Sequence, residues 1–256
     1  MKKIIQLLFL FYAGILFSQQ MGTPAPFTAA VENDPAANFQ KWTPMMQKLF
    51  QQVRDDDGIA SYYVGAEVGS PYEHEAFKKG KVYYEEEYLG EFYYRLNIFS
   101  NEIEVKRTLL EEENYKALIA NEKVSLVASN GKEYRYLTFK DEKNNTETGY
   151  ITKLLNGSDY KLYKRVVAKY LAAKPAANSM VNPIPSRFTQ FTEYYIQNGP
   201  SNEIVELPTK KNKMLKLFDS AVAKEIKDFI AQENINLAQE KDLIKIIAFL
   251  DASNLN

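Results

Sequence analysis

The feature that most constrains the fold is an alternation of apolar and polar residues between Lys81 and Leu207. In residues 102–106, Glu-Ile-Glu-Val-Lys, every second side chain is apolar, and residues 92–98 follow the same period. Successive side chains of a strand point to opposite faces, so each segment predicts a strand with one buried face and one wet face. Turn residues separate such segments at Leu89-Gly90, Asn130-Gly131, Asn156-Gly157 and Asn198-Gly199-Pro200. Asn-Gly favours tight hairpins, so we expect a twisted, largely antiparallel sheet of about eight to ten short strands.

Apolar residues recur every three or four positions on both sides of this region, which indicates helices. Thr43-Pro44 is a typical helix start, and an apolar stripe follows it at Met45, Met46, Leu49, Phe50 and Val53. Beyond Pro208 the stripes return, with Asp219-Ser220 as a cap and residues 234–236 as a break between the last two helices. This C-terminal module is too short to bury its own apolar faces. We therefore predict an α+β fold, in which an N-terminal helix precedes the sheet and a C-terminal helical module docks on it.

The first residues have the pattern of a secretory signal peptide. Lys2 and Lys3 precede an apolar run from Ile4 to Phe17, and Ser18 follows it. The run is shorter than the ~20 residues that a membrane-spanning helix needs. We expect cleavage near Ser18 and a periplasmic or secreted protein with no integral membrane segment, although an uncleaved signal acting as an anchor stays open. The expected organisation is a signal peptide at 1–18, a tether at 19–42, a helix and antiparallel β domain at 43–207, and the helical module at 208–256.

Cysteine content and charge limit the remaining classes. The chain has no cysteine, which excludes disulfides and a lipid-modified cysteine. Its net charge of −1 argues against a nucleic-acid partner. Charge is nevertheless uneven, because residues 67–113 are acidic on balance, whereas residues 151–187 hold seven bases against Asp159 alone. Complementary pairing between solvent faces would explain this, and a basic surface for an anionic lipid or cell-wall polymer is the alternative.

No motif predicts a catalytic, cofactor-binding or metal-binding residue. His74 is the single histidine, and Lys78 stands where a second histidine of a zinc-protease motif would be. No G-x-S-x-G occurs, and both S-x-x-K strings, at residues 129–132 and 158–161, fall where helical spacing is not expected. Acidic clusters at 55–57, 85–87 and 111–113 leave open a hydrolase that works with carboxylates alone, or calcium binding.

Paired tyrosines and a basic strand supply the candidate binding residues. Tyr-Tyr occurs at 62–63, 83–84, 93–94 and 194–195, and a strand turns one ring of each pair outward. An exposed tyrosine can stack on sugar or peptide, although tyrosine is also simply favoured in strands. We select five candidates from these pairs and from the basic run at 160–165: Tyr83, Tyr93, Tyr163, Lys161 and Arg165.

Three segments together resemble a group of uncharacterised secreted β-rich proteins of Gram-negative bacteria. They are residues 94–97 with 101–104, the strand 160–165, and the tail segments 216–218, 226–230 and 242–245, and the likeness spans Gly69 to Ala252. The resemblance is one of strand and helix texture. It implies no assigned activity and transfers no functional residue.

Three functions remain as hypotheses. The first is a non-enzymatic envelope or secreted protein that binds a partner protein, a cell-wall polymer or lipid through its sheet. The second is a periplasmic carrier with a hydrophobic cavity lined by Phe92, Tyr94, Leu96, Ile98 and Tyr136. The third is the carboxylate-based hydrolase.

Overall fold

A computed structural model of the chain describes residues 68–253, except residues 179 and 200. The expected signal peptide, the tether and the helix after Thr43 lie outside these residues. The described part has ten strands, followed by helices. The strands are β1 (Lys78–Tyr84), β2 (Glu87–Asn97), β3 (Glu102–Lys106), β4 (Lys116–Ala117), β5 (Val124–Ala128), β6 (Glu133–Lys140), β7 (Thr146–Asn156), β8 (Tyr160–Leu171), β9 (Arg187–Asn198) and β10 (Ile204–Glu206). The helices are α5 (Lys211–Met214), the 3-10 turn η2 (Leu215–Leu217), α6 (Ser220–Gln232) and α7 (Glu240–Ala252).

All ten strands belong to one sheet, in the order β10-β9-β8-β7-β6-β5-β1-β2-β3-β4. Every pairing between these strands is antiparallel except one, the parallel bridge between Val205 of β10 and Lys140 of β6. That bridge closes β6 to β10 into a ring. The α+β class and the largely antiparallel sheet are thus confirmed for the described residues.

The ring encloses its own small apolar core. Phe139, Ile151, Tyr163, Tyr195 and Ile204 form one buried cluster, and the rings of Phe139 and Tyr195 lie 4.5 Å apart. Each of the five strands contributes one of these residues. Every second side chain of a strand points to the same face, which here is the inside of the ring. The ring is therefore filled by side chains.

The C-terminal helices pack against the sheet through a second buried cluster. Tyr160, Leu162, Tyr194 and Ile196 of β8 and β9 share this cluster with the inward faces of α6 and α7, and the helical members are Val222, Ile226, Ile230, Leu243, Ile246, Ile247 and Leu250. Asp219 caps α6 as expected, accepting hydrogen bonds from the backbone N–H groups of Ala221 and Val222 at 2.8 and 3.0 Å. None of the helices in the described part of the chain is long and apolar enough to cross a membrane.

One expected turn is wrong. Leu89 and Gly90 lie inside β2, and the chain reverses instead at Glu85 and Glu86, where Glu85 has a φ of 53°. Gly90 pairs with Val82, next to an irregularity in the β1–β2 register. A glycine in a strand often marks such a bulge, and this is its role here. The glycines of the other three expected turns, Gly131, Gly157 and Gly199, lie between strands.

A single carboxylate ties the last helix to the β7–β8 turn. Asp251 of α7 accepts hydrogen bonds from the backbone N–H groups of Ser158, Asp159 and Tyr160 at 3.1, 2.7 and 3.0 Å. A Cβ atom at Gly157 would overlap the same carboxylate. The turn therefore needs glycine at residue 157 for the aspartate to approach.

We predict that Asp251→Ala and Gly157→Ala each lower the free energy of unfolding by about 1–2 kcal/mol, because each removes this cap. The double variant should lose little more than either single variant, since both act on one interaction. Urea unfolding of the four proteins measures the coupling. Full additivity would contradict the shared cap, and Ser158→Ala, which removes only a long 3.4 Å hydroxyl contact, is the control.

The pH dependence of stability shows how much of the Asp251 contact depends on the charge of its carboxylate. Hydrogen bonds from the turn N–H groups lower the pKa of Asp251 in the folded protein. Its contribution to stability is therefore complete above the pKa of the unfolded state and disappears as pH falls through the folded pKa, below about pH 4. The difference in stability between the native chain and Asp251→Asn should shrink over this range.

Candidate binding surface

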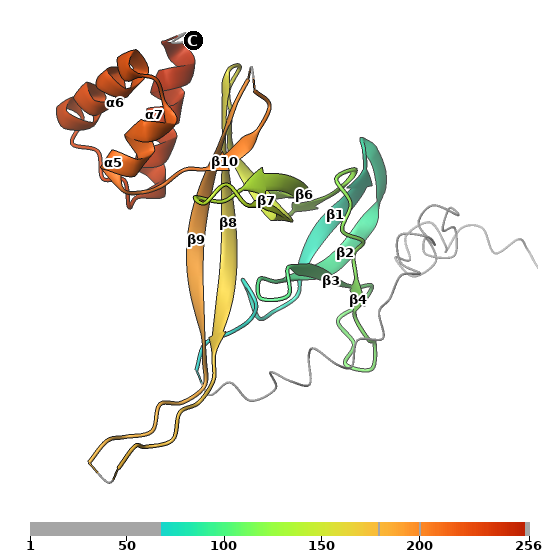
Figure 1. Ribbon diagram of the computed structural model, residues 1–256. Coiled ribbons are helices and arrows are strands. Elements are labelled where there is room, and N and C mark those ends of the chain that lie inside the picture. The colour runs from blue at the N-terminus through green and yellow to red at the C-terminus, as the bar shows by residue number, and fades with distance from the viewer. Residues whose placement is uncertain (1–67, 179, 200, 254–256) are drawn as a thin grey trace, which may run out of the picture. The chain divides into compact units, whose positions relative to one another are not determined.

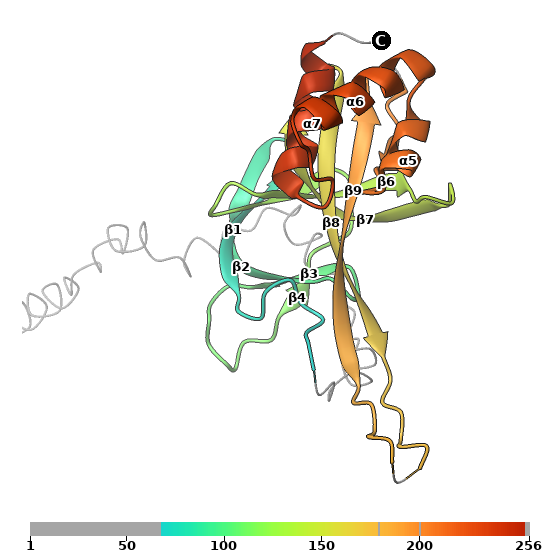
Figure 2. The same ribbon diagram turned by 90° about the vertical axis from the view of Figure 1, so that its left-hand side faces the viewer.

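The most exposed large apolar side chain of the described chain, Met180, lies on a two-stranded extension of the β8–β9 hairpin. Beyond Leu171 and before Ser186 the chain continues as an arm, defined here as the described residues 172–178 and 180–185, which leaves the rest of the sheet (Figures 1 and 2). Met180 is 95% exposed, Val181 51% and Ile184 43%. Large apolar residues are rarely gathered on a projecting segment without a function, so this tip is a candidate contact site.

The arm is held together by its own backbone. Lys174 and Ile184 form an isolated antiparallel bridge, with N–H to C=O hydrogen bonds of 2.8 and 2.9 Å in both directions. Residues 172–184 are all exposed where they are described. The pairing joins the two sides of the arm next to Ile184, and no other element covers the arm in the described part of the chain.

The base of the arm is anchored on both edges. On the β9 side, Phe188 donates its N–H to the carbonyl of Val68 at 2.9 Å, and on the β8 side Ala168 donates to the carbonyl of Ile98 at 3.0 Å. The ring of Phe188 packs edge-on against Phe99, with ring centres 5.3 Å apart. Gly69, with a φ of +80°, passes so close to the carbonyl of Phe188 that any Cβ would overlap it. The arm therefore projects from a rigid base.

Two partly buried ion pairs lie elsewhere in the described structure. The first joins Arg95 of β2 to Glu104 of β3, which face each other across the two strands. Arg95 Nε donates to Glu104 Oε2 at 3.0 Å, and its guanidinium lies 3.7 Å from the ring centre of Tyr72 and 4.6 Å from that of Phe77. Burial raises the pKa of Glu104 and Arg95 opposes that shift. Arg95 also donates to the Tyr72 hydroxyl at 3.0 Å. Arg95, Glu104 and Tyr72 therefore bond to one another, and we interpret the cluster as structural.

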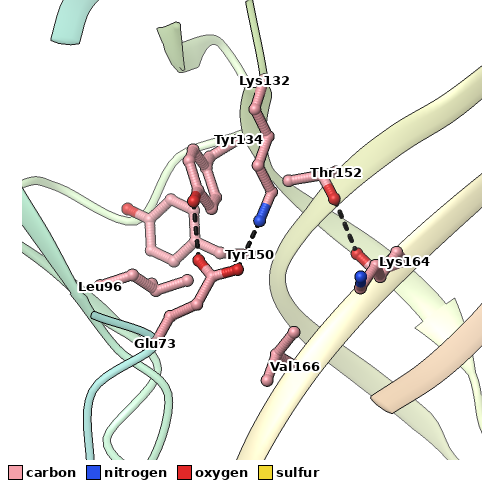
Figure 3. A pocket seen from close by; sticks show the side chains of 8 residues that line it. All are labelled: Glu73, Leu96, Lys132, Tyr134, Tyr150, Thr152, Lys164 and Val166. Carbon is pink, nitrogen blue, oxygen red and sulfur yellow. Dashed lines mark hydrogen bonds and ion pairs between the residues drawn. The ribbon is translucent and has the colours of Figure 1, made fainter. Parts of the chain in front are cut away.

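The second ion pair lies in a small pocket, drawn in Figure 3. The carboxylate of Glu73 accepts hydrogen bonds from Lys132 Nζ at 2.5 Å and from the Tyr134 hydroxyl at 2.7 Å. Although burial acts to raise it, these bonds lower the pKa of Glu73, while burial and the nearby carboxylate raise that of Tyr134. The cavity measures about 10 Å³, room for about one water molecule.

This pocket supplies neither alternative function with a site. It contains one carboxylate, already paired, whereas glycoside hydrolysis needs two. Leu96 lines it, and three of the other residues named for a carrier cavity are buried, namely Phe92 and Tyr94 of β2 and Ile98 just beyond it. Among the described residues, no group of three or more histidine or acidic side chains is placed to hold a metal ion.

The structure does not bring the five sequence-derived candidates together. Tyr163 lies in the core of the ring, 5% exposed, and donates to Gln197 Oε1 at 2.8 Å, so no ligand can reach it. Arg165 pairs with Glu147 at 2.8 Å and with Glu193 at 3.4 Å, and stacks over Phe139. Tyr83 packs on Tyr88, Tyr93 lies beneath Lys79, and Lys161 faces Gln197 across the hairpin.

The acidic segment 67–113 and the basic segment 151–187 do not neutralise each other through the ion pairs of the described residues. Acids of the 67–113 segment pair with bases outside 151–187, as in Glu73 with Lys132 and Glu85 with Lys123, or within their own segment, as in Glu104 with Arg95. Within 151–187, Lys164 pairs with Glu240 of α7, at 2.6 Å. None of the acids in the described ranges forms an ion pair with Lys169, Lys174 or Arg187, which are all exposed.

Sequence reasoning missed the tip residues Met180, Val181 and Ile184. A signal for them exists: the strand alternation stops between Leu171 and Arg187, where Pro175, Pro183 and Pro185 and four alanines occur with no acid. Such a stretch inside a hairpin predicts a long exposed connection.

The chain was compared with family models, with curated proteins and with solved structures. None of the three comparisons finds a match. The assignment of function therefore depends on the geometry of the arm and on the sequence.

Proposed function

We propose that the protein is an exported, non-enzymatic binding protein that attaches to the cell envelope through the arm of its β8–β9 hairpin. The exposed apolar tip carries this proposal, because Met180, Val181 and Ile184 project from a rigid base with nothing packed over them in the described chain. The basic and apolar pattern of residues 1–18 supports export.

The paired stem of the arm favours binding over a passive loop. A free loop would leave its ends unpaired, whereas this one has a hydrogen-bonded rung at Lys174 and Ile184 and an anchored base at Ala168 and Phe188. A pre-positioned contact costs less ordering entropy on binding. The two ion pairs described above have their partners within the sheet, so we base the proposal on the arm.

Shortening the arm tests this proposal. Replacing residues 175–183 by Asn-Gly would join the paired Lys174 and Ile184 by a two-residue hairpin turn and remove the tip without disturbing the sheet. In fractionated native cells, we expect the unaltered protein in the envelope fraction and the shortened protein in the soluble extracellular or periplasmic fraction, with an unchanged melting temperature.

The control replaces the other exposed apolar pair of the described chain, Leu109 and Leu110, by serine. This variant should fractionate like the unaltered protein. If the shortened protein stays in the envelope fraction as fully as the native one, the arm is not the attachment site and the proposal fails.

A further inference from the structure

We propose that the partner of the arm is an anionic lipid surface, into which the tip inserts. This inference rests on the proposed function and names its ligand. Three properties of residues 160–192 point to it: the exposed apolar side chains of the tip, the prolines that interrupt the row of backbone donors along the arm, and the position of the positive charges behind the tip.

The tip carries exposed apolar side chains and no charge. From Pro175 to Ser186 the sequence contains no charged residue. Met180, Val181 and Ile184 supply the apolar volume, and Ala176 and Ala177 beside them are exposed as well. A narrow projecting finger offers little area to a folded partner, but it can enter a fluid apolar phase without a shaped pocket.

The backbone of the arm is unsuited to pairing with a partner's strand. Pro175, Pro183 and Pro185 have no N–H, so each removes a donor that an added strand would use. The backbone N–H and C=O groups of Lys174 and Ile184 are hydrogen-bonded to each other. The arm therefore cannot present a continuous row of donors, and its side chains are the better means of recognition. This argues against addition of a strand from a second protein.

Positive charge follows directly behind the tip. Lys174 lies on the rung opposite Ile184, Arg187 on the rung opposite Leu171, and Lys169 on the rung opposite Thr189. We call these three residues the basic collar. Between residues 160 and 192 the chain has no acid, and no described acid neutralises the collar. An apolar end with cations set back along the same arm matches the depth profile of an anionic membrane surface.

The opposite end of the hairpin is occupied by the helical module, so the arm can approach a surface alone. Asp251 of α7 caps residues 158–160 at the start of β8, whereas the arm begins after Leu171. Twelve strand residues at ~3.3 Å each separate the two sites by about 40 Å. Insertion of the tip thus leaves the helices clear of the lipid.

Sedimentation of the purified protein with lipid vesicles tests the inference. We expect binding to vesicles of phosphatidylcholine mixed with phosphatidylglycerol, weaker binding to phosphatidylcholine alone, and loss of affinity as salt increases. Lys169→Gln, Lys174→Gln and Arg187→Gln should each weaken binding about fivefold. The matched control carries Lys224→Gln, Lys227→Gln and Lys241→Gln, which change three exposed lysines of α6 and α7 and should bind normally.

A second measurement reports insertion directly. Since the chain has no cysteine, Met180→Cys and Lys224→Cys each create one site for an environment-sensitive fluorophore. On anionic vesicles the emission of the label at 180 should shift to the blue, and that of the label at 224 should not. The triple variant Met180→Ser, Val181→Ser, Ile184→Ser should lose binding and keep the native melting temperature.

The outcomes separate this inference from the proposed function. Equal binding to neutral and anionic vesicles, an unchanged affinity of the triple serine variant, or no shift at residue 180 overturns the lipid assignment. In another outcome, the native protein fails to bind vesicles while the variant with the shortened arm is still lost from the envelope fraction. In that case the ligand is a protein or polymer and the proposed function stands. If the shortened arm releases nothing, the proposed function itself fails.

Discussion

Replacing Glu104 by alanine is expected to lower the free energy of unfolding by about 3 kcal/mol or more. Its side chain is 3% exposed and accepts from the guanidinium of Arg95, which is itself only 16% exposed. Without the carboxylate, a cation stays buried against Tyr72 and Phe77 with no opposite charge. Urea unfolding followed by circular dichroism measures the loss.

Two further variants define the cause. Glu91→Ala breaks an exposed ion pair, in which the side chain of Lys79 is 57% exposed and that of Glu91 is 45% exposed. This variant should lower the free energy of unfolding by at most about 1 kcal/mol. Arg95→Met combined with Glu104→Met removes both charges and should be clearly more stable than Glu104→Ala. If Glu104→Ala costs no more than Glu91→Ala, the cluster of Arg95 with its aromatic neighbours does not depend on the ion pair.

Leu250→Ala in α7 is expected to cost about 2–5 kcal/mol, because Leu250 is fully buried in the cluster shared by sheet and helices. Since that cluster joins β8 and β9 to α6 and α7, the whole described chain should still unfold in one transition at a lower midpoint. Helical circular dichroism and tyrosine fluorescence are the two probes.

Leu217→Ala is the matched control, the same substitution in the same module at a position that is 42% exposed. It should change stability by less than about 1 kcal/mol. Separate midpoints for the helical and tyrosine signals in the native chain would show that the helices are not part of the cooperative core.

Local patterns in the sequence were enough to predict several strands, the cap of α6 and most of the expected turns. Alternation placed β2 and β3, and Asp219 marked the start of α6, because these features depend on neighbours a few residues away. The turn at Glu85-Glu86 escaped prediction since three consecutive glutamates are not a turn signal, while Gly90 serves as strand glycine at a register shift.

The candidate surface could not be assembled from the sequence for a different reason. Alternation tells which side chains share a face, but only the bridge between Val205 and Lys140 determines that the face with Tyr163 becomes the inside of a ring. Arg165 is likewise removed from the surface by Glu147 and Glu193, from two other strands. Pairings between distant residues decide exposure, and one sequence does not contain them.

The hydrogen bonds between Asp251 and residues 158–160 join positions that are more than ninety residues apart in the chain. Contacts of such long separation form late, after the intervening loop has been closed. The cluster beneath α7 therefore remains incomplete until the final helix is available. A chain delivered from its N-terminus, as in vectorial transport, would stay uncommitted to its native packing until almost all of it had arrived.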